Sequence, residues 1–255
     1  MYIMNNKLQK TKQNQLNGSG KKNNKLAGLN IHTLTKSLGG LTLPRLFYQL
    51  VVFVLDGSGS MTFDGITGKS KGEEVEGSIK NVIKRLKKSK NNNSFDVAMF
   101  AYANESVEIM PLMPVPDIDL SEDFNPCNHI IYYEQTYLKD TLTEVKELTD
   151  NYLEKNMDKN AQALILVLSD GAIHDQKEAE NICRSFDWNN NKVKISSILF
   201  ESKTWKEKYQ DDDLEFLKVN LRNLASGKEF FASTLDPEEV RKHMIKSIST
   251  VSKID

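Results

Sequence analysis

The 255-residue sequence contains only two cysteines, Cys127 and Cys183, and no metal-binding motif surrounds either of them. So few cysteines argue against a disulfide scaffold and a structural zinc site, and they are consistent with a reducing compartment. Long apolar runs are also missing: the first, Leu46–Leu55, is about ten residues long and too short to span a bilayer. It begins too far along the chain to be the core of a signal peptide, so we expect a cytoplasmic protein.

Acidic residues are absent from the first 55 positions, which carry eight of the 34 lysines and arginines. We interpret residues 1–45 as a basic N-terminal extension, of which residues 1–30 are expected to be disordered or ordered by a partner. Residues 31–45 carry spaced leucines and are expected to pack on the domain or on another protein. A basic arm beside an acidic body contacts something anionic, lies on its own domain, or is simply a solvated leader.

From residue 46 to residue 255 the sequence has the pattern of one domain in which strands alternate with helices. The apolar runs 50–55 and 163–168 lack polar alternation, as do central strands covered on both faces. We predict strands over 46–55, 95–103, 106–112, 163–171, 192–200 and 228–233, and helices over 73–88, 137–154, 177–186, 214–225 and 236–252. A turn at 104–105 makes one pair an antiparallel hairpin. The prediction is therefore a three-layer, doubly wound α/β fold whose mostly parallel sheet has one antiparallel edge strand.

Carboxylates and hydroxyls follow the two central strands. The first strand ends in Asp56-Gly-Ser58-Gly-Ser60, and the second ends in Ser-Asp170-Gly. In open α/β sheets ligands bind outside the carboxyl ends of the strands, and oxygen ligands without histidine or cysteine suit a hard divalent cation. This pattern predicts an Mg²⁺ site, with Mn²⁺ as the alternative. A metal-free alternative is that Asp56 caps the following turn while the serines satisfy backbone groups.

The Asp-x-Ser-x-Ser sequence after one apolar strand, together with "LSDG" after another, resembles the metal-ion-dependent adhesion site of von Willebrand factor type A (vWA) domains. The resemblance extends over about residues 46–252 in the order of elements. It implies that the first Asp and both Ser approach the metal, joined by a Thr from an intervening loop and an Asp from a later strand. The implied metal ligands are Asp56, Ser58, Ser60, Thr136 and Asp170.

Thr136 departs from the family pattern, because Glu134 and Gln135 precede it where glycines are usual. Thr141 and Thr143 therefore remain alternatives, although both lie deeper in the expected helix. Glu134 is a further candidate for contact with a water of the metal shell.

The resemblance implies a protein-interaction module, in which the metal's open position accepts an Asp or Glu of a partner. The chain resembles stand-alone bacterial vWA proteins associated with tellurite resistance, and partners of MoxR-like ATPases, which act as adaptors in larger intracellular assemblies. One alternative is a nucleic-acid-associated or structural subunit that acts through residues 1–45. Another is a metal-dependent phosphohydrolase, but no second acid follows Asp56 by two residues, and no glycine-rich phosphate loop with lysine is present. We expect a non-enzymatic module without catalytic residues.

Overall fold

The computed structural model describes residues 45–186, 191–202 and 211–252. The chain divides into two units, Met1–Pro44 and Arg45–Asp255, and the fold described here belongs to the second. The expectations for residues 1–44 lie outside the described residues.

Six strands form one sheet in the order β3-β2-β1-β4-β5-β6. Neighbouring strands are parallel, except that β3 runs antiparallel to β2 at one edge. The strands are β1 (Tyr48–Asp56), β2 (Phe95–Tyr102), β3 (Ser106–Pro114), β4 (Ala161–Ser169), β5 (Val193–Phe200) and β6 (Phe231–Thr234). The predicted doubly wound α/β fold, with its antiparallel hairpin, is confirmed.

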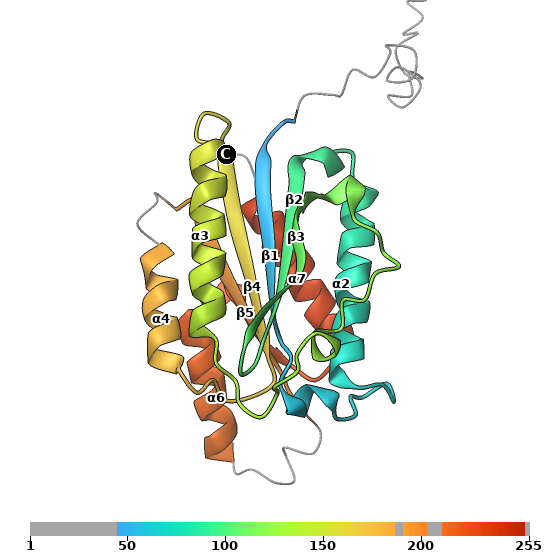
Figure 1. Ribbon diagram of the computed structural model, residues 1–255, viewed down its shortest axis with the longest axis vertical. Helices are drawn as coiled ribbons and strands as arrows, with labels where there is room; N and C mark the ends of the chain where they lie inside the picture. The colour runs from blue at the N-terminus through green and yellow to red at the C-terminus, as the bar shows by residue number, and fades with distance from the viewer. Residues whose placement is uncertain (1–44, 187–190, 203–210, 253–255) are drawn as a thin grey trace, which may run out of the picture. The chain divides into compact units, whose positions relative to one another are not determined.

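Helices cover both faces of this sheet (Figure 1). One face packs against α2 (Lys71–Lys87) and α7 (Pro237–Val251), and the other against α3 (Lys139–Lys155), α4 (Gln176–Ser185) and α6 (Asp211–Leu224). Side chains of β1 belong to the hydrophobic cores on both faces of the sheet, because alternate side chains of a strand point to opposite faces. Val51, Phe53 and Leu55 face α2 and α7, whereas Leu50, Val52 and Val54 face α3. All six side chains are fully buried, which explains the unbroken apolar run.

Most boundaries differ from the predictions by one to three residues, and two of these differences have a clear physical reason. Helix α2 begins at Lys71, two residues early, because Ser70 caps it and forms a capping box with Glu73. The strand predicted over 228–233 was only half right: Lys228–Phe230 is a 3₁₀ turn, and strand β6 begins at Phe231.

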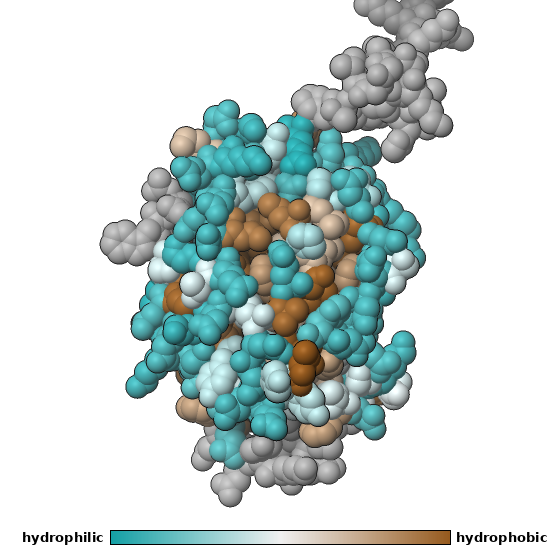
Figure 2. All heavy atoms as spheres, in the orientation of Figure 1, coloured by the Kyte–Doolittle hydropathy of each residue, from teal (hydrophilic) through white to brown (hydrophobic). Residues whose placement is uncertain are grey.

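Strand β3 is an irregular edge. It contains Pro111 and Pro114 and pairs with β2 through two register shifts. An open groove of about 800 Å³ lies between this part of the sheet and α3, lined by Phe100, Leu112 and Leu148 among others. Figure 2 shows hydrophobic side chains gathered in this hollow between hydrophilic ones.

Both cysteines are free thiols. Burial raises the pKa of Cys127 and of Cys183 to about 12, so neither thiol ionises near neutral pH. Within the described residues, no helix combines the length and apolar character needed to cross a membrane.

Candidate metal centre

The candidate centre lies where β1 and β4 end side by side. The two strands pair in parallel up to Leu55 and Leu168, so Asp56 and Asp170 emerge at the same edge of the sheet. Both carboxylates are completely buried. Directly after Asp56, the Gly57 N–H donates to the Tyr102 carbonyl at 2.8 Å, beside the last pair of β1 and β2. A β-carbon at Gly57 would lie 2.7 Å from the Ile130 side chain, so this position requires glycine.

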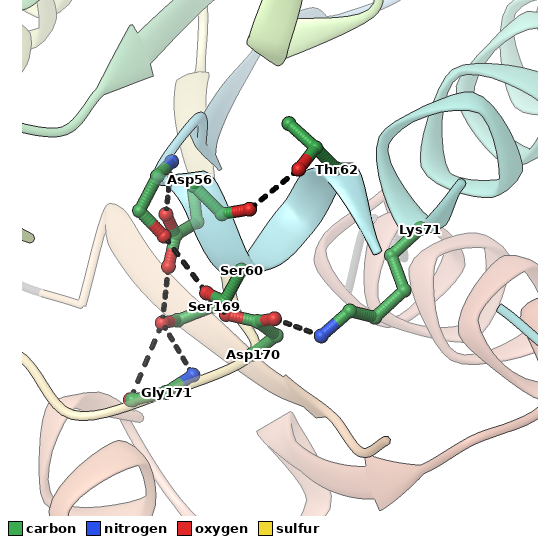
Figure 3. Close-up of polar contacts among 9 residues, drawn as sticks. Asp56, Ser60, Thr62, Lys71, Ser169, Asp170 and Gly171 are labelled. Atoms are coloured by element: carbon green, nitrogen blue, oxygen red, sulfur yellow. Dashed lines mark hydrogen bonds and ion pairs between the residues drawn. The ribbon is translucent and has the colours of Figure 1, made fainter. Parts of the chain in front are cut away.

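Four of the five predicted ligands are joined by one series of hydrogen bonds (Figure 3). The Ser58 N–H donates to Asp56 Oδ1 at 2.8 Å. The hydroxyls of Ser58 and Ser60 lie 3.1 Å apart, and Ser60 Oγ donates to Asp170 Oδ1 at 2.7 Å. Residues more than a hundred positions apart in the chain therefore place two carboxylates and two hydroxyls together. Ser60 is partly exposed, which leaves the centre open to solvent on that side.

Thr136 lies in the loop before α3 and is bound to the loop that carries Asp170. The backbone N–H of Thr136 donates to the ring nitrogen Nδ1 of His174 at 3.0 Å. In return, the backbone N–H of His174 donates to the Thr136 carbonyl at 2.8 Å. Asp175 adds a second link, because its carboxylate accepts the N–H groups of Leu138 and Lys139 at 2.8 Å each. Thr136 is buried, but within the described chain no hydrogen bond connects its hydroxyl to the other four predicted ligands.

The alternative threonines lie on α3. The Thr143 hydroxyl is exposed and donates to the Lys139 carbonyl of its own helix at 2.9 Å. The Thr141 hydroxyl is buried without a hydrogen-bond partner among the described residues. Glu134 is exposed. The choice of Thr136 therefore remains a prediction.

Two further residues contact the carboxylates and were missed in the sequence. Ser169 donates its hydroxyl hydrogen bond to Asp56 Oδ2 at 2.7 Å. The Lys71 ammonium, from the first turn of α2, contacts Asp170 Oδ2 (Figure 3). The local sequence does not mark Lys71 as buried, since Lys69, two residues earlier, is exposed. The place of Lys71 directly after a helix N-cap is the one available signal, because a lysine opposes the helix dipole there.

The charges of the centre favour a bound cation. Burial, and next the charge of Asp170, raise the pKa of Asp56 to about 6, although hydrogen bonds from Ser169 and Ser58 lower it. The centre thus holds two buried carboxylates, of which Asp170 is paired with the Lys71 ammonium. Elsewhere in the described part of the chain, as here, no group of three or more His, Cys, Asp or Glu side chains is arranged to hold a metal. The carboxylate and hydroxyl oxygens gathered here are ligands that a hard divalent cation accepts.

A comparison with protein-family models matches residues 51–236 to the von Willebrand factor type A domain. The chain belongs to the vWA family. The expected family is therefore confirmed, and domains of this family are generally metal-dependent protein-interaction modules. A search of curated proteins gives no significant match.

Solved structures with low sequence identity share this vWA fold. Proximal thread matrix protein 1 from the mussel byssus, solved with zinc in its adhesion-site motif, has a TM-score of 0.55 and 17% identity, covering 81% of this chain and 47% of that one. The pilus adhesin SpaC from Lactobacillus rhamnosus GG has a TM-score of 0.63 and 9% identity over 82% of this chain and 30% of that one. BatB from Bacteroides thetaiotaomicron has a TM-score of 0.53 and 14% identity, with 80% and 99% covered. The match thus spans about half of the mussel protein's length and nearly all of BatB.

Proposed function

We propose that this vWA domain is a non-enzymatic adaptor of a cytoplasmic bacterial assembly that captures a partner's carboxylate through bound Mg²⁺. Asp56, Ser58, Ser60 and Asp170 would hold the ion, with Thr136 as the fifth ligand, and Mn²⁺ would substitute for Mg²⁺. The ion would supply a Lewis-acid position that an Asp or Glu of the partner completes. A MoxR-like ATPase or a larger complex built around one is the partner class we favour.

The hydrogen-bonded series from Asp56 through Ser58 and Ser60 to Asp170 carries this proposal. The four side chains offer only oxygen atoms as metal ligands. They lie at the carboxyl edge of the sheet, between β1 and β4. At this edge the strand order reverses direction, which is where open α/β sheets bind ligands. Buried carboxylates gain most from a cation, because desolvation disfavours their charged form.

The surface next to the centre is suited to a protein partner. We call five exposed or half-exposed apolar and aromatic side chains near it the aromatic rim: Phe63, Ile131, Tyr132, Tyr133 and Tyr137. The rim is fixed by backbone hydrogen bonds, including Gly59 N–H to the Tyr133 carbonyl at 2.8 Å and Tyr137 N–H to the Ala103 carbonyl at 2.9 Å. Exposed aromatic side chains are enriched in protein–protein interfaces, and rigid ones lose little entropy on binding.

Metal binding is tested first, by titration calorimetry of the full chain with Mn²⁺ and with Mg²⁺. We expect about one ion per chain, and loss of binding in Asp56→Ala and Asp170→Ala. Ser121→Ala is the control, because Ser121 is an exposed serine of another loop. Unchanged binding in both aspartate variants would show that the site is misassigned.

Partner capture is tested next, by affinity purification with the full chain in Mg²⁺ and in EDTA, followed by identification of the retained proteins. One protein should be retained in Mg²⁺ and lost in EDTA and in Ser58→Ala, Thr136→Ala and Asp170→Ala. The losses should be far from additive in double variants, since each substitution damages one coordination sphere. A partner that EDTA and all three variants leave bound would contradict the proposal.

Thr136→Ala is the discriminating variant of this series. If Ser58→Ala and Asp170→Ala release the partner and Thr136→Ala does not, the loop ligand is wrong while the metal-dependent module stands. If only deletion of residues 1–45 releases the partner, the basic extension is the working surface instead.

A further inference from the structure

Lys71 is a buried lysine at an unfavourable place in a helix. It is the first residue of α2, directly after the N-cap Ser70, and its side chain is 1% exposed. A helix N-terminus carries partial positive charge, so acidic residues are stabilising there and a lysine is not. Burying an ammonium costs further free energy unless an anion compensates it. Both costs require a nearby negative charge, and Asp170 supplies it.

The contact joins Lys71 to the candidate metal centre itself. Its ammonium meets Asp170 Oδ2, while the other oxygen, Oδ1, accepts the hydrogen bond from Ser60 at 2.7 Å. Asp170 is therefore shared between the Lys71 ammonium and the hydroxyl of Ser60, a predicted metal ligand. Figure 3 shows the lysine reaching from α2 across to this carboxylate.

We propose that Lys71 is a tethered cation that neutralises Asp170 in the metal-free protein and competes electrostatically with the divalent ion. The inference rests on the proposed function, since it concerns the regulation of the same centre. A divalent ion bound through Asp170 would lie close to the ammonium in a low-dielectric environment, where like charges repel strongly. Lys71 thereby stabilises the metal-free fold and weakens metal binding, so that the centre responds to changes in metal concentration instead of holding its ion permanently.

The test is titration calorimetry with Mn²⁺ on the full-length protein and three variants. Lys71→Met removes the charge and keeps most of the side-chain volume. We expect it to bind Mn²⁺ at least about tenfold more tightly than the unmodified protein, equivalent to about 1.4 kcal/mol. Lys71→Arg keeps the charge and should gain much less. Lys69→Met, which removes an exposed lysine two residues away, should stay within about twofold, because exposed charges contribute little.

Thermal unfolding supplies a second measurement that does not depend on a partner. In EDTA, Lys71→Met should melt at a lower temperature than the unmodified protein, because the buried Asp170 carboxylate loses its compensating charge. Saturating Mn²⁺ should raise its melting temperature more than that of the unmodified protein. If Lys71→Met does not fold in EDTA, it is refolded with Mn²⁺, and both measurements are repeated on Lys71→Gln. The affinity and the melting temperature of a charge-removing variant can then still be compared with those of the unmodified protein.

The outcomes separate this inference from the proposed function. If the unmodified protein binds Mn²⁺ and both Lys71→Met and Lys71→Gln bind it equally or more weakly, Lys71 supports the metal centre and the competition is refuted. If none of these proteins binds Mn²⁺, the proposed function fails together with this inference. The competition is supported if Lys71→Met and Lys71→Gln bind Mn²⁺ more tightly than the unmodified protein, while Lys71→Arg gains much less and Lys69→Met stays within about twofold.

Discussion

Asp56→Asn should stabilise the metal-free protein, although it removes a residue of the candidate centre. Asp56 is fully buried, and the charge of Asp170 lies nearby. Its folded-state pKa is raised from 3.8 to about 6. The stability contributed by the protonated carboxyl is therefore complete below pH 3.8 and is lost as the pH rises through about 6. At neutral pH the folded protein carries an unfavourable charge at this position.

The size of the effect follows from that difference in pKa. The change from 3.8 to about 6 corresponds to about 3 kcal/mol in the free energy of unfolding. Asparagine keeps an oxygen that can accept the Ser58 N–H, but the hydrogen bond from Ser169 is weakened, at a cost of about 1 kcal/mol. The net gain at pH 7 is about 1–2 kcal/mol, which for a domain of this size raises the melting temperature by about 2–8 °C.

The assay is urea or thermal unfolding of both proteins in EDTA at pH 7 and at pH 4.5. The advantage of Asp56→Asn should shrink at the lower pH, where the native carboxyl takes up its proton. Saturating Mg²⁺ should reverse the order at pH 7, because only the native protein gains the free energy of metal binding. A variant that is less stable than the native protein in EDTA at pH 7, or an advantage independent of pH, would refute the reasoning.

Three other substitutions test the surrounding structure by unfolding measurements. Gly57→Ala should destabilise the fold by about 1–3 kcal/mol, because its β-carbon would lie 2.9 Å from the Pro126 carbonyl oxygen. Gly77→Ala, on the exposed face of α2 with no atom near the new β-carbon, should instead stabilise it by about 0.5–1 kcal/mol. Burial lowers the pKa of His243 below 6.5, so its contribution to stability is present above that pH and is lost as the pH falls. His243→Gln should reduce the loss of stability as the pH falls below 6.5. An unchanged loss of stability in this variant would show that His243 is not its source.

The regular elements were predictable because their burial leaves a strong pattern in the sequence. The runs at 50–55 and 163–168 are apolar at every position, as the two central strands require. The hairpin was readable from its two-residue turn, and α7 from the Asp236–Pro237 start, where the Asp236 carboxylate caps the helix. The 3₁₀ turn at Lys228–Phe230 was missed because three residues are too few to show a helical or a strand period.

The candidate centre was predictable only in part. Asp56, Ser58, Ser60 and Asp170 follow from two short motifs at strand ends, and the structure brings them together. Lys71 was not predictable from composition, because its burial depends on how the start of α2 lies against the end of β4. The aromatic rim was not predicted either, and it includes the exposed Ile131 and Tyr132. Exposure of apolar loop residues depends on tertiary packing, which no local pattern encodes.

The two edges of the sheet limit how copies of this protein can associate. The edge strand β3 is irregular, since it contains two prolines and pairs with β2 through two register shifts. The other edge strand, β6, is only four residues long. Prolines lack the N–H groups that an added strand needs, and bulges twist an edge away from a flat partner. We therefore expect that crowding or partial unfolding does not readily extend the sheet from one molecule to the next. The chain can be concentrated in an assembly with little tendency to form intermolecular β-structure through these edges.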